Sequence, residues 1–313
     1  MVITTSNSTS TSKTKKAVKL IIAISLLGIL FIPSLANAQD EPLAWNSLSD
    51  RKSCPIDQSA VWAEYEAGEE CIRYFFSGEI DDAPLVLVRM SGDRSTAMQQ
   101  APEDIANNTV EAQQAIAERR AHERGLPVIL LARPGTYGSS GDHGERRQKS
   151  EFLALNAALD EIMQKHRIGK FVLSGHSGGA TAIGALLTLG RDDIACAIMT
   201  SGAFGLLERA QRLREEQGNP PRPGIDTTGL PSPYDPIDHI DGVIDDPERT
   251  IIIIGNRNDT NTPFDLQSRF SAALSDAGHR VILMDHPAQG PTFHNLEGRV
   301  GFTAIEYCDI GIN

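Results

Sequence analysis

The sequence contains few aromatic side chains and only one long apolar run. Phe, Trp and Tyr together make up 5% of the chain, too few to suggest the large apolar acyl pocket of a lipase. Beyond the N-terminal region, no segment is apolar enough to cross a membrane as a helix. Internal repeats are also absent. These absences weigh against a lipase and against an integral membrane protein.

Positive charge is scarce as well. The chain has 29 Lys and Arg against 41 Asp and Glu, which gives a formal net charge of -12. A protein this acidic would repel nucleic acid and anionic membranes. We therefore expect neither as a partner.

The first 38 residues have the organisation of a secretory signal peptide. A basic cluster that ends at Lys19 precedes a mostly apolar run from Leu20 to Ile32, and Ala36-Asn37-Ala38 follows. The run is too short to span a bilayer of about 30 Å as a helix, although an uncleaved anchor remains the alternative. We expect cleavage after Ala38, a mature domain over 39–313, no membrane contact after cleavage, and a periplasmic or extracellular location.

The four cysteines are Cys54, Cys71, Cys196 and Cys308. They form no CxxC and have no nearby histidine pair, so their spacing fits no zinc site and we expect no metal. An even number of cysteines in an exported protein predicts disulfides. A bridge from Cys54 to Cys71 would staple a polar segment ahead of the main sheet. A bridge from Cys196 to Cys308 requires the final helix to pack beside a central strand, and four free thiols are the alternative.

Short apolar runs alternate with longer helical segments from residue 84 onward. The patterns predict strands at 84–90, 127–132, 170–174, 194–200, 250–254 and 280–284, and helices at 96–124, 150–166, 178–189 and 295–308. Continuous apolar strands separated by helices are typical of a parallel sheet covered on both faces. The predicted fold class is therefore α/β, with a doubly wound, mostly parallel sheet. The Pro-rich segment at about 203–243 is expected to form a short lid above the carboxyl ends of the strands.

A candidate nucleophile lies between an expected strand and an expected helix, in Gly175-His176-Ser177-Gly178-Gly179. Such a turn folds the chain back sharply, which favours glycine on either side of the serine. It also presents the serine at a helix N-terminus, where negative charge is stabilised. We predict Ser177 as the nucleophile, with a glycine-rich turn without chemistry as the alternative.

This junction and two further loops resemble the α/β-hydrolase superfamily. The loops are Arg133–Ser140, similar to a glycine-rich loop of the family, and Gly255–Pro263, similar to the loop that carries its acid. The segment Tyr234–His239 resembles prolyl-oligopeptidase-like peptidases and their esterase relatives, although no β-propeller fits in the short N-terminal segment. The likeness covers about Pro84 to the C-terminus. It implies the α/β-hydrolase fold and a Ser-His-Asp triad that needs no cofactor.

The order of the triad in this family is Ser, acid, His, which the sequence can supply. Asp259 follows the strand expected at 250–254, whereas no acid follows the strand that ends at Thr200. Two histidines come after the last expected strand. The loop before the final helix favours His294 as the base, and His286 is the alternative.

An oxyanion formed during attack on a carbonyl needs backbone donors, each worth about 3 kcal/mol. We expect one from Gly178, directly after the nucleophile. The second is expected from Ser91, in a loop where the family often has His-Gly-x-Gly and this chain has Arg-Met-Ser-Gly. His176, Tyr137 and His143 are expected to line the substrate site.

These patterns predict an exported serine hydrolase that cleaves a carboxylic ester through an acyl-enzyme intermediate. A peptidase of short peptides is the first alternative, because peptide and ester cleavage share this chemistry. An inactive hydrolase-fold binding protein, with one triad member displaced, is the second. The sequence does not predict the substrate or the oligomeric state.

Overall fold

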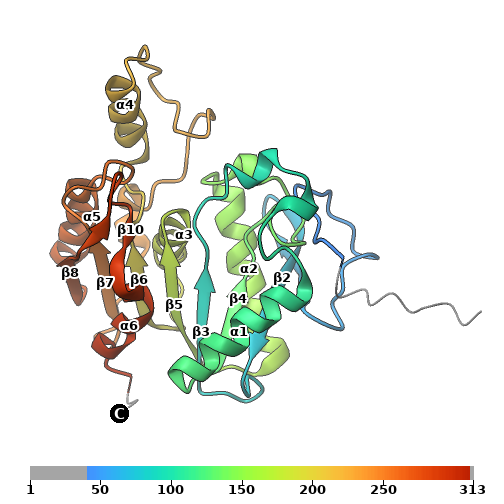
Figure 1. Ribbon diagram of the computed structural model, residues 1–313. Helices are drawn as coiled ribbons and strands as arrows, with labels where there is room; N and C mark the ends of the chain where they lie inside the picture. The colour runs from blue at the N-terminus through green and yellow to red at the C-terminus, as the bar shows by residue number, and fades with distance from the viewer. Residues whose placement is uncertain (1–40, 311–313) are drawn as a thin grey trace, which may run out of the picture. The chain divides into compact units, whose positions relative to one another are not determined.

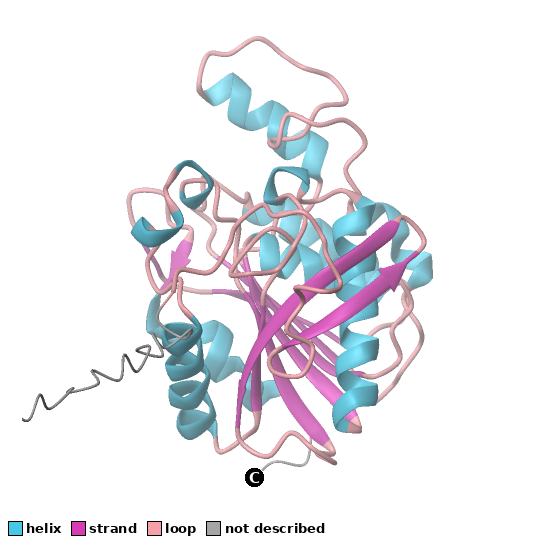
Figure 2. Ribbon diagram, turned by 90° about the vertical axis from the view of Figure 1, so that its right-hand side faces the viewer, coloured by secondary structure: helices cyan, strands magenta, loops and turns pink. Residues whose placement is uncertain are grey.

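The computed structural model describes residues 41–310, and the signal-peptide prediction for residues 1–38 lies outside them. In the described part, eight strands form one sheet with helices on both faces (Figure 1, Figure 2). The strands are β1 (Ala60–Tyr65), β2 (Gly68–Ser77), β3 (Leu85–Met90), β4 (Val128–Leu131), β5 (Lys170–His176), β6 (Ile194–Thr200), β7 (Thr250–Gly255) and β8 (Val281–Asp285). A separate two-stranded ribbon pairs β9 (Ala288–Gln289) with β10 (Asn295–Leu296).

The strand order in the sheet is β1-β2-β4-β3-β5-β6-β7-β8. Neighbours from β4 to β8 in this order are parallel, whereas β2 is antiparallel to both β1 and β4. The central strands are mostly apolar, and every residue of β7 is buried, because helices cover both faces. The predicted α/β class with a mostly parallel sheet is confirmed.

The α-helices are divided between the two faces of the sheet. They are α1 (Val110–Arg124), α2 (Lys149–His166), α3 (Gly178–Thr188), α4 (Leu206–Glu216), α5 (Phe264–Asp276) and α6 (Val300–Thr303). In Figure 1, α1 and α6 lie in front of the sheet, and α2, α3 and α5 lie behind it. Short 3-10 turns make up the remaining helical pieces: η1 (Ala97–Gln99), η2 (Pro102–Asp104), η3 (His143–Glu145), η4 (Pro236–Gly242), η5 (Glu297–Arg299) and η6 (Ala304–Tyr307).

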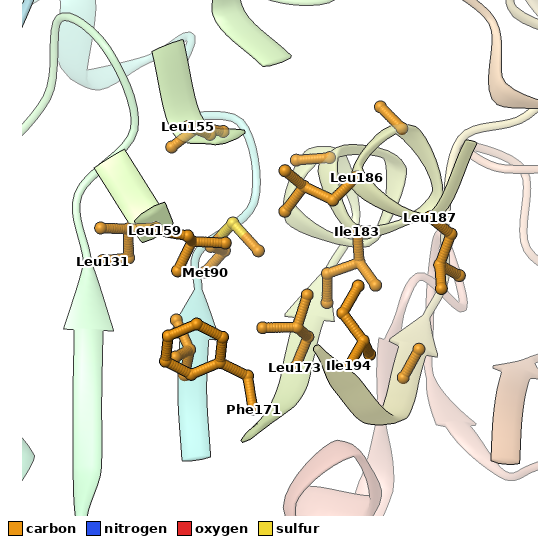
Figure 3. Close-up of a cluster of buried hydrophobic side chains, with 14 of the residues drawn as sticks. Met90, Leu131, Leu155, Leu159, Phe171, Leu173, Ile183, Leu186, Leu187 and Ile194 are labelled. Carbon is orange, nitrogen blue, oxygen red and sulfur yellow. The ribbon is translucent and has the colours of Figure 1, made fainter. Parts of the chain in front are cut away.

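The larger hydrophobic core lies between the sheet and the helices α2 and α3. Leu155 and Leu159 of α2 and Ile183 of α3 face Phe171 and Leu173 of β5, and all five side chains are fully buried (Figure 3). Burying an aliphatic or aromatic side chain of this size contributes about 1.5–3 kcal/mol. This packing holds β5 and α3 rigidly, and the turn between them is the one that carries Ser177.

Four parts of the chain differ from the sequence predictions. The helix expected at 96–124 begins only at Val110, where the Thr109 side chain caps it by accepting the Ala112 N–H, and the 3-10 turns η1 and η2 occupy part of the chain before it. The helix expected at 295–308 is broken into short pieces, since Gly298 has a left-handed φ of 64°. The hairpin of β1 and β2 and the helix α5 were not predicted.

The segment 203–243, predicted as a lid, holds the helix α4 and the turn η4. Figure 1 shows α4 projecting beyond the carboxyl ends of β5 and β6. The buried Asp235 carboxylate ties both ends of this segment together, because it accepts hydrogen bonds from the backbone N–H groups of Gly205, Leu206 and Ile237.

Both candidate disulfides are present in the structure. Cys54 is bonded to Cys71 of β2, with Cα atoms 5.6 Å apart, and Cys196 of β6 is bonded to Cys308, with Cα atoms 5.8 Å apart. The alternative of free thiols is therefore wrong for this structure. The second bridge forms although the final helix is broken, because η6 contacts β6 and β7. Within residues 41–310, the helices are too short or too polar to cross a membrane.

Candidate active site

Ser177 occupies the sharp turn between β5 and α3. Its backbone has φ 54° and ψ -122°, a conformation that L-residues rarely adopt and that costs about 1–3 kcal/mol. The turn is tight on both sides: a Cβ on Gly175 would lie 2.5 Å from the Gly179 backbone, and one on Gly179 would lie 2.5 Å from the Met90 carbonyl oxygen. The glycines that the motif analysis singled out are therefore required by the packing around this serine.

The predicted acid and the predicted base are in direct contact. The Nδ1 atom of His294 lies 2.9 Å from Oδ2 of Asp259, and the Asp259 side chain is fully buried. The other carboxylate oxygen of Asp259 accepts the backbone N–H groups of Asn261, at 2.8 Å, and Thr262, at 2.9 Å. The carboxylate is thus held in one orientation, and it fixes His294 through a single ring nitrogen.

A hydroxyl that the sequence analysis did not single out completes this arrangement. Thr262 Oγ1 lies 2.7 Å from Oδ2 of Asp259, 3.0 Å from the Ser201 carbonyl oxygen and 3.2 Å from Nδ1 of His294, so its single proton has two acceptors within reach, of which Oδ2 is the nearer. The Ser201 hydroxyl in turn donates to the His294 carbonyl oxygen at 2.9 Å. Thr262 and Ser201 therefore connect the loop of the acid, the end of β6 and the loop of the base.

A cavity of about 730 Å³ opens beside Ser177, and its walls include His294, His176, Ser91 and Gly92. The predicted base and the predicted nucleophile thus line the same cavity. The hydrogen bonds of residues 41–310 do not include one between the Ser177 hydroxyl and His294. Catalytic hydrogen bonds are often long without substrate, so this geometry is compatible with a base that engages later.

The loop after β3 lies against the nucleophile. A Cβ on Gly92 would be 3.0 Å from the Ser177 Cβ, and one on Gly179 would be 2.7 Å from the Ser91 carbonyl oxygen. Both Ser91 and Gly92 line the cavity. The predicted donors Gly178 and Ser91 are therefore brought together at Ser177, with Gly92 adjacent to them.

The remaining predicted residues are placed differently. His176 lines the cavity, and its ring centre lies 4.9 Å from that of His294. Tyr137 does not line this cavity: its buried ring packs against Trp45, with Arg94 above it. The ring Nδ1 of His286 lies 2.9 Å from the neighbouring Pro287 carbonyl oxygen, and His286 is not part of the cavity wall either.

His143 is also outside the cavity wall, and it is almost fully buried. Its Nε2 accepts the backbone N–H of Arg94 at 3.2 Å, and its Nδ1 lies 3.3 Å from the Pro134 carbonyl oxygen. Burial, with the charge of Arg133, lowers the pKa of His143 to about 3, so the ring is neutral. The histidine therefore links the loops after β3 and β4. The prediction that His143 lines the cavity is wrong.

Burial also affects His176. Together with the neighbouring His294, it lowers the pKa of His176 to about 4. At neutral pH His176 carries no charge, so it does not repel a proton on His294.

A network of ion pairs lies behind the nucleophile turn. Asp93 pairs with Arg133 at 2.8 Å, with Arg146 at 3.3 Å, and with Arg147. Burial alone would raise the pKa of the Asp93 carboxyl, but these three arginines hold it well below its usual range. Asp93 also fills the space beside Gly178, where a Cβ would lie 1.9 Å from its carboxylate oxygen. The charge network thus packs directly against the turn.

Within residues 41–310, no group of three or more His, Cys, Asp or Glu side chains is arranged to hold a metal ion.

No protein-family model matches the chain, and no curated protein matches it in sequence. Solved structures match it in fold. Est1E from Butyrivibrio proteoclasticus is 13% identical, with a TM-score of 0.53 over 80% of this chain and 97% of that one. The Pyrococcus furiosus esterase Pf2001 is also 13% identical, with a TM-score of 0.54 over 85% and 96%. Identities this low show a shared fold and leave the substrate open.

Proposed function

We propose that this chain, which has the α/β-hydrolase fold, is an exported serine hydrolase that cleaves a carboxylic ester. The observation that carries the proposal is that His294, which pairs with the buried Asp259, lines the same cavity as Ser177. The strained φ of Ser177 supports it, because strain of this kind is concentrated at functional sites.

In the proposed mechanism, His294 Nε2 takes the proton of the Ser177 hydroxyl as its oxygen attacks the ester carbonyl. Asp259 stabilises the imidazolium that forms, and it keeps the ring nitrogen Nδ1 protonated. The tetrahedral intermediate places its negative oxygen near the backbone N–H of Gly178 and that of Ser91 or Gly92. His294 then protonates the leaving alcohol, and water releases the acyl group from Ser177 by the same route.

A carboxylic ester is proposed ahead of a peptide because the lid is short. The acyl-enzyme chemistry itself would serve either substrate. A screen of p-nitrophenyl esters beside aminoacyl-nitroanilides separates the two, and faster turnover of the nitroanilides would move the proposal to a peptidase.

The decisive test uses a fluorophosphonate probe, which labels an activated serine. Wild-type protein should be labelled at Ser177, and Ser177→Ala should lose both the labelling and nearly all ester hydrolysis. Ser275→Ala, a change of an exposed serine on α5, is the matched control and should behave as wild type. Full labelling of Ser177→Ala, or none of the wild type, would refute the proposal.

Export is supported by the two disulfides, which form and persist in oxidising compartments. Peptide mapping without reduction, on protein from the native host, should recover the Cys54 and Cys71 peptides linked and an N-terminus at Gln39. Free thiols and an intact N-terminus would count against export.

A further inference from the structure

The cavity beside Ser177 is positively charged, although the chain as a whole has a net charge of -12. Six arginines line its wall: Arg89, Arg94, Arg146, Arg147, Arg209 and Arg214. Asp93 is the one carboxylate among the lining residues that the structure describes. A concentration of one charge in a concave site attracts ligands of the opposite charge.

Part of this charge is neutralised by the network behind the nucleophile turn. Asp93 pairs with three arginines, Glu151 pairs with Arg133 at 2.7 Å, and Asp226 pairs with Arg147 at 2.9 Å. The network therefore balances three positive against three negative charges: Arg133, Arg146 and Arg147 against Asp93, Glu151 and Asp226. It leaves no negative charge for the other arginines of the wall.

The other four arginines make no ion pair within residues 41–310. Arg94 is exposed and lies over the Tyr137 ring, and Arg214 donates to the carbonyl oxygens of Ile225 and Asp226. Burial and then the charges of neighbouring arginines lower the pKa of Arg89 to about 10. The wall thus carries an excess of positive charge that no carboxylate of the described chain balances.

Arg209, on the lid helix α4, is the most deeply buried of these four, with 5% of its surface exposed. Its guanidinium donates three hydrogen bonds to neutral oxygens: two to Asn261, at 2.7 and 2.6 Å, and one to the Thr227 hydroxyl at 3.0 Å. A guanidinium has five N–H groups, so two remain for a ligand. Burial, together with the charge of Arg147, lowers the pKa of Arg209 to about 9, which leaves it charged at neutral pH.

We infer that Arg209 forms an anion-binding subsite of this cavity and that the substrate is an ester that carries a carboxylate. A buried arginine without a counter-ion is unfavourable until an anion pairs with it, and its planar fork fits a carboxylate through two hydrogen bonds. The more exposed arginines of the wall attract the anion towards this position. The inference rests on the proposed hydrolase function, because it names the substrate class of the same site.

Arg209 also has a structural role that the test must separate from binding. Its bonds to Asn261 connect α4 to the loop of Asp259, so its loss could lower the hydrolysis of every ester. The measured quantity is therefore a ratio of kcat/KM values for two substrates: the mono-p-nitrophenyl ester of adipic acid, which keeps a free carboxylate, and the methyl ester of the same compound. A general loss of activity cancels in this ratio.

Wild-type enzyme should prefer the anionic ester by roughly tenfold to a hundredfold, the range expected for a hydrogen-bonded charge pair. Arg209→Gln should abolish this preference, and Arg214→Gln should reduce it by a smaller factor. Arg212→Gln is the matched control, because Arg212 lies on the same helix, pairs with Asp265 and does not line the cavity. High salt should weaken the preference of the wild type, because ions screen the exposed arginines.

Equal rates for the two esters in wild-type enzyme would overturn the subsite while leaving the hydrolase proposal intact. An unchanged ratio in Arg209→Gln would overturn the assignment to Arg209. If neither ester is cleaved and the fluorophosphonate does not label Ser177, the hydrolase proposal fails. The subsite is then tested by itself, by calorimetric titration of the protein with adipate. Adipate should then bind wild type and Arg212→Gln about tenfold or more tightly than Arg209→Gln, and equal or absent binding would refute the subsite.

Discussion

The two sides of Ser177 differ in how their charges are satisfied. On one side, the single carboxylate of Asp259 has a hydrogen-bond partner for each oxygen, from His294, Thr262 and two backbone N–H groups. On the other side, arginines outnumber carboxylates, and Arg209 has no carboxylate partner among residues 41–310. A satisfied group is fixed in position, whereas an unsatisfied buried charge favours binding of a ligand. In the proposed function, the first side carries out catalysis and the second side binds the substrate.

The largest effect should come from removing the proposed general base, His294. His294→Ala should lower kcat by about 10⁴-fold or more, because residues of a triad act as a unit. His286→Ala is the matched control and should change kcat little, since His286 does not line the cavity. Steady-state kinetics with one p-nitrophenyl ester measures both. The reverse ranking would make His286 the base.

The second largest effect, a loss of stability, should come from the arginine-rich side. It is expected when Asp93, the carboxylate that pairs with three of these arginines, is replaced. Asp93→Asn would leave Arg133, Arg146 and Arg147 without one of their negative partners, and breaking a buried ion pair costs about 3–5 kcal/mol. Urea unfolding measures the loss. The control Glu208→Gln, in an exposed pair with Arg212, should cost less than about 1 kcal/mol.

The same carboxylate should make stability depend on pH. Its pKa is lower in the folded than in the unfolded chain, so its contribution is complete above the unfolded value of about 3.9 and is lost as the pH falls below it. The urea concentration at the unfolding midpoint of wild type should therefore decrease as the pH is lowered below about 4. In Asp93→Asn this decrease should be shallower. Parallel curves for the two proteins would contradict this role.

The smallest effect should come from a single hydroxyl on the catalytic side. Thr262→Val removes the contact of Thr262 with Asp259 and should lower kcat about tenfold with little change in KM, as expected for one hydrogen bond. Thr262→Ser should restore the rate, which separates positioning of Asp259 from general packing. Thr260→Val, in the same loop but exposed, should behave as wild type.

Much of the sheet could be predicted because continuous apolar runs are local signals. The strands β3, β5, β6 and β7 lie where the sequence places them, since each is buried on both faces. The hairpin of β1 and β2 escaped prediction because its strands carry polar residues such as Glu64 and Glu69 on exposed positions. The helix α4 was not predicted because it directly precedes the Pro-rich stretch 220–236 and was grouped with it, although Leu206–Glu216 itself contains no proline.

The candidate triad was predictable because the nucleophile motif and the loops after β7 and β8 are short segments with a fixed chain order. Tyr137 and His143 were expected to line the cavity because they lie in loops at the correct edge of the sheet. The structure places both beneath other residues, since a loop position does not determine which way a side chain points.

The sequence by itself determined the α/β class, the strand–turn–helix around Ser177 and the four cysteines, because apolar periodicity and glycine spacing act over a few neighbouring residues. Only the tertiary structure decided which cysteines pair, that Thr262 supports Asp259, and that arginines from three separate segments surround one cavity. Long-range packing sets these relations. Arg89 and Arg209 are distant in the chain, and their positive charges lie beside one cavity only because the loops and α4 meet above the sheet.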